Sequence, residues 1–273
     1  MKPAMAQAPM RLLWQSSTPI TRYPAYNAAI VAHAARVLGP GVEVVVGGTV
    51  RPTYGTYTRA NFFLKSRDIL DSVMAAARDG VDGVAIGCFL DPLLHELREF
   101  LDIPVLGIAE TGMHTACLLG RRFAVLSHVE ALNVKVYEGL VRQYGLESRC
   151  AGMAAVDLSM DRLETAMQQD PEPALRLIRE TAARLVAGGA EVIVPGCGLL
   201  NLFCVRNGLS QVEGATVLDV TGALLKATES MVVLRRVSGT AVSRAGYYAG
   251  PQPADRDRTL AAFAGDSARK DTR

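Results

Sequence analysis

The sequence predicts an α/β protein built from two similar halves, and two observations carry this prediction. Apolar segments of strand length alternate with stretches of helical period, which is the pattern of a largely parallel sheet covered by helices. A nine-residue segment that ends in Gly-Cys also occurs twice, so that Cys88 and Cys197 stand at the same point of two related units.

The individual elements follow from apolar patterning and from their start and stop residues. Ser66 is the expected cap of one helix and Gly80 its stop, and a glycine pair ends another helix at 187. Helices are expected at 66–79, 93–101 and 172–187, and strands at 11–14, 42–46, 83–86, 105–108, 123–126, 151–156, 191–194 and 216–218.

The composition permits a large buried core and argues against several classes of partner. Of the 273 residues, 49% are hydrophobic and 21% are charged, which suits one large domain or two smaller ones. A net charge of +2 without a run of Lys or Arg argues against nucleic acid and anionic membrane surfaces as partners. No apolar run is long enough to cross a bilayer, and the N-terminus lacks the apolar core of a signal peptide, so we expect a cytoplasmic protein.

The repeated segment reads GVDGVAIGC at 80–88 and GAEVIVPGC at 189–197, and the two copies align without a gap at a constant offset of 109 residues. Each copy contains a helix stop, an acidic residue, a buried strand and then Gly-Cys. A weaker similarity relates RLLWQSS at 11–17 to RFAVLSH at 122–128, since each reads as a strand that ends in small polar residues. Each half would therefore present a cysteine at the carboxyl end of a parallel strand, where open α/β sheets bind their ligands.

The duplicated setting distinguishes two of the five cysteines. An isolated cysteine is usually a small buried hydrophobic residue, and we interpret Cys117, Cys150 and Cys204 in this way, as free thiols. Behind Cys88, the Asp91-Pro92 pair is expected to cap the helix at 93–101, whose N-terminus would lower the pKa of the thiol. The backbone N–H groups after Cys197 are expected to act in the same way.

Two thiols on opposite faces of a small molecule suit one kind of chemistry. Inversion of a carbon centre needs a base on one face and an acid on the other, and a thiolate and a thiol can exchange these roles after each turnover. The chain contains no dinucleotide-binding glycine motif, no Walker loop and no set of Cys and His at metal-ligand spacing. The sequence therefore predicts a racemase that needs no metal or other cofactor and acts on a small molecule.

Two segments, GCFLDPLLHELREFLDIPVLGIAE at 87–110 and AEVIVPGCGLLN at 190–201, resemble the aspartate/glutamate/hydantoin racemase superfamily. The nearer branch is that of the hydantoin and allantoin racemases, whose first cysteine lies in a Cys-Phe-Gly-Asp-Pro-Gly-like run. This chain matches the run except that Leu90 and Leu93 replace its glycines.

The resemblance covers residues 10–235 and implies how the halves are arranged. Two α/β halves with parallel four-stranded sheets would face each other across a central active-site cleft, with Cys88 and Cys197 as the two acid–bases. It also implies a homo-oligomer, a dimer or larger. The first half would comprise 10–112 and 215–240 and the second 113–214, and we expect flexible termini at 1–9 and 250–273.

The loop after the first strand departs from this pattern and bears on the substrate. Hydantoin racemases commonly have Asn-Pro-Asn-Thr there, and the amino-acid racemases have Asp-Ser, whereas this chain has Gln-Ser-Ser-Thr at 15–18. An uncharged loop favours a substrate without an ammonium group, such as a 5-substituted hydantoin or another cyclic ureide. The expected substrate contacts are Gln15, Ser17, Thr18, Phe89, Ser127, His128, Gly198 and Leu199.

Three alternatives remain open on the sequence alone: a maleate-type cis-trans isomerase, an amino-acid racemase, and a non-catalytic small-molecule binding protein on the same scaffold. The segment 51–63 is interpreted as a packed surface loop, with closure over the substrate as the alternative. Its candidate contacts would be Tyr54, Tyr57 and Arg59, and structural or surface roles are expected for His33, His95, His114 and, as a helix cap, Glu110.

Overall fold

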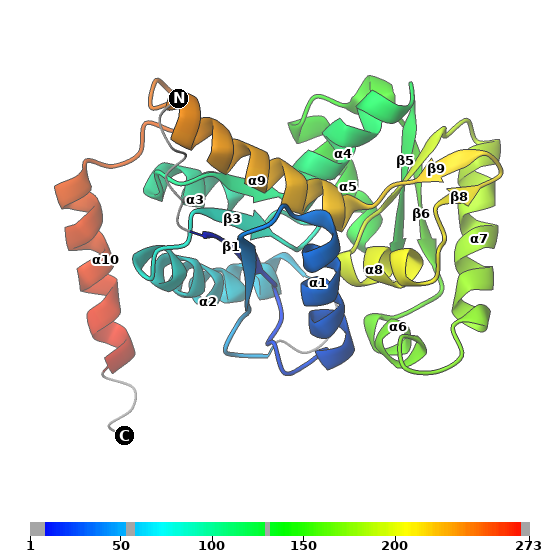
Figure 1. Ribbon diagram of the computed structural model, residues 1–273, viewed down its shortest axis with the longest axis horizontal. Coiled ribbons are helices and arrows are strands. Elements are labelled where there is room, and N and C mark those ends of the chain that lie inside the picture. The colour runs from blue at the N-terminus through cyan, green and yellow to red at the C-terminus, as the bar shows by residue number, and fades with distance from the viewer. Residues whose placement is uncertain (1–8, 53–57, 129–131, 269–273) are drawn as a thin grey trace.

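The first sheet contains four parallel strands, as predicted, and their order is β2-β1-β3-β4. The computed structural model describes residues 9–52, 58–128 and 132–268, and Figure 1 shows their arrangement. The central strands are buried along their length because helices cover the sheet, which explains why they read as continuous apolar runs. The strands are β1 (Met10–Gln15), β2 (Val42–Gly47), β3 (Gly83–Ile86) and β4 (Val105–Gly107).

The second sheet has five strands rather than the expected four, in the order β6-β5-β7-β9-β8. The additional strand β8 pairs antiparallel with β9. Glu213 and Gly214 join them, and both have positive φ angles (48° and 81°), as the tight turn of a two-residue hairpin requires. The strands are β5 (Phe123–His128), β6 (Cys150–Val156), β7 (Val192–Pro195), β8 (Gln211–Val212) and β9 (Ala215–Val217).

The helices surround these sheets, and none of those in the described residues is long and apolar enough to cross a membrane. The helix expected at 66–79 begins earlier, at Arg59, because Thr58 provides its cap by accepting a hydrogen bond from the Asn61 N–H (3.2 Å). The helices are α1 (Pro24–Val37), α2 (Arg59–Arg78), α3 (Leu94–Phe100), α4 (Ile108–Leu119), α5 (Leu132–Gln143), α6 (Met160–Ala166), α7 (Glu172–Ala187), α8 (Gly198–Arg206), α9 (Val220–Ser238) and α10 (Pro253–Ala268), with a 3₁₀ turn at Glu147–Arg149.

Two expectations about the C-terminal part need correction. Strand β9 pairs with β7, so residues 215–217 belong to the second sheet, and the chain returns to the first half only with α9. That helix packs on α1, α4 and the strands β3 and β4 (Figure 1). The tail expected to be flexible from 250 onward contains α10, and the Arg256 guanidinium donates to the Phe100 carbonyl oxygen (3.0 Å). Residues 1–8 and 269–273 lie outside the described residues.

The two halves are joined by a buried carboxylate. Glu164 on α6 accepts hydrogen bonds from the backbone N–H groups of Ala25 (2.7 Å) and Tyr26 (3.1 Å), so a residue of the second half caps helix α1 of the first. The side chain is only 8% exposed. A second, exposed contact lies beside it, the ion pair between Arg22 and Asp161 (3.0 Å).

We expect Glu164→Ala to lower the free energy of unfolding by about 1–3 kcal/mol, because it leaves two N–H groups of α1 without their acceptor. Asp161→Asn is the matched control on the same helix, and it should cost about 0–1 kcal/mol because the ion pair is exposed. Urea unfolding measures both. Equal losses in the two variants would contradict the assignment of Glu164 as the joint between the halves.

Candidate active site

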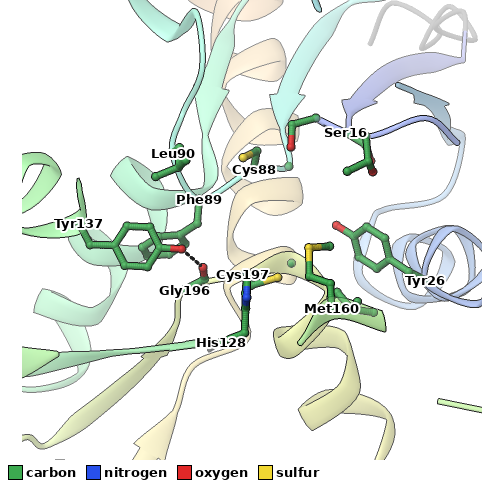
Figure 2. Close-up of a pocket in the computed structure, with 15 residues that line it drawn as sticks. Ser16, Tyr26, Cys88, Phe89, Leu90, His128, Tyr137, Met160, Gly196 and Cys197 are labelled. Atoms are coloured by element: carbon green, nitrogen blue, oxygen red, sulfur yellow. Dashed lines mark hydrogen bonds between the residues drawn. The ribbon is translucent and has the colours of Figure 1, made fainter. Parts of the chain in front are cut away.

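The two Gly-Cys pairs lie at the ends of equivalent strands, as the repeated segment predicted. Gly87 and Cys88 follow β3, and Gly196 and Cys197 follow β7. Figure 2 shows that the cysteines reach one pocket from opposite sides, one from each half. The carboxyl ends of two parallel strands, one in each sheet, thus meet at the same cavity.

Glycine is required before each cysteine because an aromatic ring packs against the strand end. A β-carbon at Gly87 would lie 2.3 Å from the Trp14 ring, and one at Gly196 would lie 2.9 Å from the ring of Tyr137. Real β-carbons do not approach other atoms so closely, so any larger residue would push the ring away. The Gly-Cys pattern therefore follows from packing as well as from the position of the thiol.

The pocket is small and partly open. The space between its side chains is about 40 Å³, which is room for a few water molecules. Eight of the expected site residues line it: Ser17, Thr18, Cys88, Phe89, His128, Cys197, Gly198 and Leu199. The other lining residues were not among the expected contacts; they are Ser16, Tyr26, Gly87, Leu90, Tyr137, Met160 and Gly196.

Two expected contacts, Gln15 and Ser127, lie behind the pocket instead. The Gln15 side chain donates to the Ser16 carbonyl oxygen (2.9 Å) and accepts from the Ser72 hydroxyl (2.8 Å). Ser127 donates to the Tyr137 hydroxyl (3.5 Å), which in turn donates to the carbonyl oxygen of Gly196 (2.6 Å). Successive side chains of a strand alternate between faces, so neighbours of a pocket residue point away from it. Both residues support lining residues from outside.

Burial raises the pKa of the Cys88 thiol, and three groups oppose the rise: the Ser17 hydroxyl, the backbone N–H of Leu90 and the positive charge of Lys65. The expected lowering by the N-terminus of the next helix is wrong for this residue, because α3 begins only at Leu94. The Ser17 hydroxyl and the positive charge of Lys65 are thus the groups that favour the thiolate of Cys88.

Cys197 is buried against the start of a helix. Burial raises the pKa of its thiol to about 11, and the backbone N–H groups of Leu200 and Leu199 oppose this rise. Cys197 is the N-cap residue of α8, so the expected supply of N–H groups is present, although burial outweighs it.

The remaining polar groups of the pocket are neutral. Burial lowers the pKa of His128, at the end of β5, to about 4, so its imidazole is uncharged at neutral pH. The Ser16 side chain is buried, and its hydroxyl has no hydrogen-bond partner among the described residues. Among the described residues that line the pocket there is no Asp, Glu, Lys or Arg. Such a pocket suits a small ligand that is polar but uncharged.

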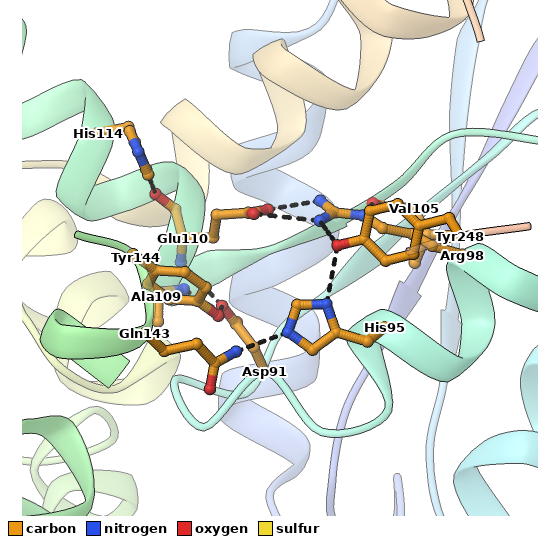
Figure 3. A network of polar contacts seen from close by, with 10 residues as sticks. All are labelled: Asp91, His95, Arg98, Val105, Ala109, Glu110, His114, Gln143, Tyr144 and Tyr248. Carbon is orange, nitrogen blue, oxygen red and sulfur yellow. Dashed lines mark hydrogen bonds and ion pairs between the residues drawn. The ribbon is translucent and has the colours of Figure 1, made fainter. Parts of the chain in front are cut away.

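Asp91 holds the loop that carries Cys88, although not as predicted. Instead of capping α3, its carboxylate accepts from the Ala109 N–H (3.0 Å) and the Glu110 N–H (2.8 Å) at the start of α4, and from the Tyr144 hydroxyl (2.7 Å; Figure 3). Gly107 leaves room for this carboxylate, since a β-carbon there would lie 2.3 Å from it. Burial raises the pKa of Asp91 to about 6.

Figure 3 also shows where three other candidates lie. Glu110, in the first turn of α4, pairs with Arg98 (2.5 Å) rather than lining the pocket. His95 bonds to the Tyr248 hydroxyl (2.8 Å), and His114 bonds to the Glu110 carbonyl oxygen (2.8 Å). The contacts of His95 and His114 agree with the structural roles expected from the sequence. The expected role of Glu110 as a helix cap is wrong, because Gly107 is the N-cap residue of α4 and Glu110 lies inside the helix.

The other candidates lie away from the pocket. His33 pairs with Asp219 (2.7 Å) between α1 and the start of α9. Arg59 is exposed at the start of α2, whereas Tyr54 and Tyr57 fall outside the described residues. In the described part of the chain, no group of three or more His, Cys, Asp or Glu residues could hold a metal ion. The cysteines are free, and Cys117, Cys150 and Cys204 do not line the pocket.

Comparison with known proteins identifies the family. A family profile described as Asp/Glu/Hydantoin racemase matches residues 24–228. The chain is 34% identical to a hydantoin racemase from Rhizobium meliloti over 185 residues, which cover 67% of this chain and 72% of that protein.

Two solved structures are similar along most of their length. An allantoin racemase from Klebsiella pneumoniae has a TM-score of 0.75 and 28% identity, over 89% of this chain and 94% of its own. Another, from Pseudomonas fluorescens, has a TM-score of 0.76 and 26% identity, over 89% of this chain and 98% of its own. The chain therefore belongs to the Asp/Glu/hydantoin racemase family, on its hydantoin and allantoin racemase branch, and is an isomerase of the racemase type.

Proposed function

We propose that this protein racemises a 5-substituted hydantoin or a related cyclic ureide by proton transfer between Cys88 and Cys197. One observation carries the proposal: two thiols, supplied by different halves, line opposite sides of a single pocket that has no charged side chain among its described lining residues. The similarity to hydantoin and allantoin racemases supports the same class of substrate.

In the proposed reaction the thiolate of Cys88 removes the proton from C5 of the ring. The electron pair of the broken C–H bond is delocalised onto the neighbouring C4 carbonyl oxygen. The thiol of Cys197 then donates a proton to the opposite face of C5, which gives the other enantiomer and leaves Cys197 as the thiolate. The reverse sequence converts the second enantiomer, so one proton shared by two thiols serves both directions.

The neutral lining of the pocket supports a ureide in preference to a free amino acid. An ammonium group buried there would lack a carboxylate partner, and an unpaired buried charge costs several kcal/mol or more. The ring N–H and carbonyl groups of a ureide need only neutral partners, which hydroxyls such as those of Ser17 and Thr18 can supply. The enolate oxygen would be stabilised by similar donors.

Cys88→Ser and Cys197→Ser should each lose racemisation by at least about 10²-fold, because each removes the acid or base from one face of the substrate. The measurement is loss of optical rotation from each enantiomer of a panel of hydantoins and allantoin. Cys117→Ser is the matched control, because this thiol lies on α4 outside the pocket, and it should keep wild-type activity. Full activity in Cys88→Ser or in Cys197→Ser would contradict the two-thiol mechanism.

The pH dependence of kcat/KM should follow the ionisation of the two thiols. Because burial raises the pKa of both, kcat/KM should increase as the pH rises above neutral and one thiol ionises. A hydroxyl that donates to a thiolate lowers the pKa of that thiol, so Ser17→Ala should move the ascending limb to higher pH. The rate at which iodoacetamide alkylates Cys88, followed by peptide mass, should shift in the same direction.

The control for this effect is Thr18→Val, which removes the neighbouring hydroxyl. It should leave the pH dependence of Cys88 alkylation unchanged. An ascending limb that stays in place in Ser17→Ala, or that moves equally in both variants, would show that Ser17 does not tune Cys88.

A further inference from the structure

We propose that two side chains, Ser16 and Leu90, determine which substrates the pocket accepts: Leu90 excludes bulky 5-substituents, and Ser16 donates a hydrogen bond to a polar group of the substrate. The inference rests on the proposed racemisation of a ureide. It goes further in assigning a compact substrate and the two residues that select it.

Both residues stand where the chain departs from the motifs of the hydantoin racemases. Ser16 takes the position of proline in the Asn-Pro-Asn-Thr run, and Leu90 takes that of the first glycine in the Cys-Phe-Gly-Asp-Pro-Gly-like run. Both line the pocket, whereas Leu93, which replaces the second glycine, does not. In Figure 2, Ser16 and Leu90 lie on either side of Cys88.

Leu90 adds bulk where glycine would leave space. The pocket has only about 40 Å³ of free space, so the four carbon atoms of this side chain limit what fits beside Cys88. The backbone does not require glycine at Leu90: the left-handed φ angles nearby are those of Asp91 (42°) and Leu93 (60°). Its N–H, which acts on the Cys88 thiol, is a backbone group that a change of side chain would keep.

Ser16 adds a polar group that has no partner in the part of the chain that the structure describes. Its side chain is 4% exposed and its hydroxyl makes no hydrogen bond to any described residue, whereas its backbone N–H donates to the Gly47 carbonyl oxygen (2.9 Å). Such a buried hydroxyl costs free energy until something bonds to it. A proline at this position could offer no donor. The unpartnered hydroxyl therefore fits a hydrogen-bonding group of the ligand.

The first experiment measures kcat/KM of the wild type, Leu90→Ala and Leu90→Gly on hydantoins with 5-methyl, 5-isopropyl and 5-benzyl substituents. The wild type should prefer the methyl compound, and both variants should raise the ratio of benzyl to methyl by roughly tenfold or more. Leu93→Gly is the control, because it removes a leucine with a left-handed backbone outside the pocket and should leave the ratio unchanged. An unchanged ratio in the Leu90 variants, or an equal rise in Leu93→Gly, overturns the role of Leu90.

The second experiment tests the hydroxyl. Ser16→Ala should lower kcat/KM for the preferred substrate by roughly tenfold, because the ligand then loses a donor in a buried site. The melting temperature of the free protein should stay the same or rise, since the variant removes an unsatisfied group. The increase in melting temperature on adding ligand should shrink, and Ser16→Thr should restore part of it. Full activity in Ser16→Ala overturns the assignment.

A third measurement separates this inference from the proposed reaction, because it needs no substrate. Iodoacetamide and the larger N-ethylmaleimide both alkylate thiols, and peptide mass reports the rate at Cys88. Leu90→Ala should increase the rate at which N-ethylmaleimide alkylates Cys88 relative to the rate with iodoacetamide. Leu93→Gly should leave this ratio unchanged. If no ureide is racemised by the wild type, the proposed function fails, while the labelling ratio still decides whether Leu90 restricts the pocket.

Discussion

One close approach between the halves, at Gly198, creates the site. A β-carbon on this residue would lie 2.4 Å from the Tyr26 hydroxyl oxygen and 3.3 Å from the Gly87 carbonyl oxygen, both of which belong to the first half. Gly198 follows Cys197 and Gly87 precedes Cys88, so this contact brings the two thiols to one pocket. The buried Glu164 carboxylate secures the same joint, because it accepts from the backbone of Tyr26 on one side and belongs to α6 on the other.

Burial at this joint has opposite effects on binding and on ionisation. It limits the access of bulk water to the pocket, which strengthens the hydrogen bonds made to a polar ligand. It also raises the pKa of both thiols, which makes the thiolate harder to form. Different groups oppose this effect at the two thiols: the Ser17 hydroxyl, the Leu90 N–H and the positive charge of Lys65 at Cys88, and the first N–H groups of α8 at Cys197. The two thiols are thus equivalent in position, but different groups favour their ionisation.

Much of this arrangement could be predicted from the sequence because it is local. Single strands and helices leave a pattern in the sequence through their own packing. This explains the repeated Gly-Cys, the apolar runs before it and the glycines that end helices. The contributions of Tyr26, Tyr137 and Met160 could not be predicted, because they come from α1, α5 and α6 and reach the pocket only through tertiary packing. The predicted role of Asp91 as the cap of the next helix was wrong for a related reason. The space left by Gly107 lets its carboxylate reach the start of α4 instead.

The most direct test of the two-thiol site is the isotope content of the product formed in D₂O from a single enantiomer. With one acid–base on each face, the proton removed by Cys88 cannot return to the opposite face, so the enantiomer formed early should carry deuterium at C5. The unreacted substrate should remain largely protonated over the same interval. Product that retains the substrate's own hydrogen would contradict the account, because it would mean that a single group both removes and returns the proton.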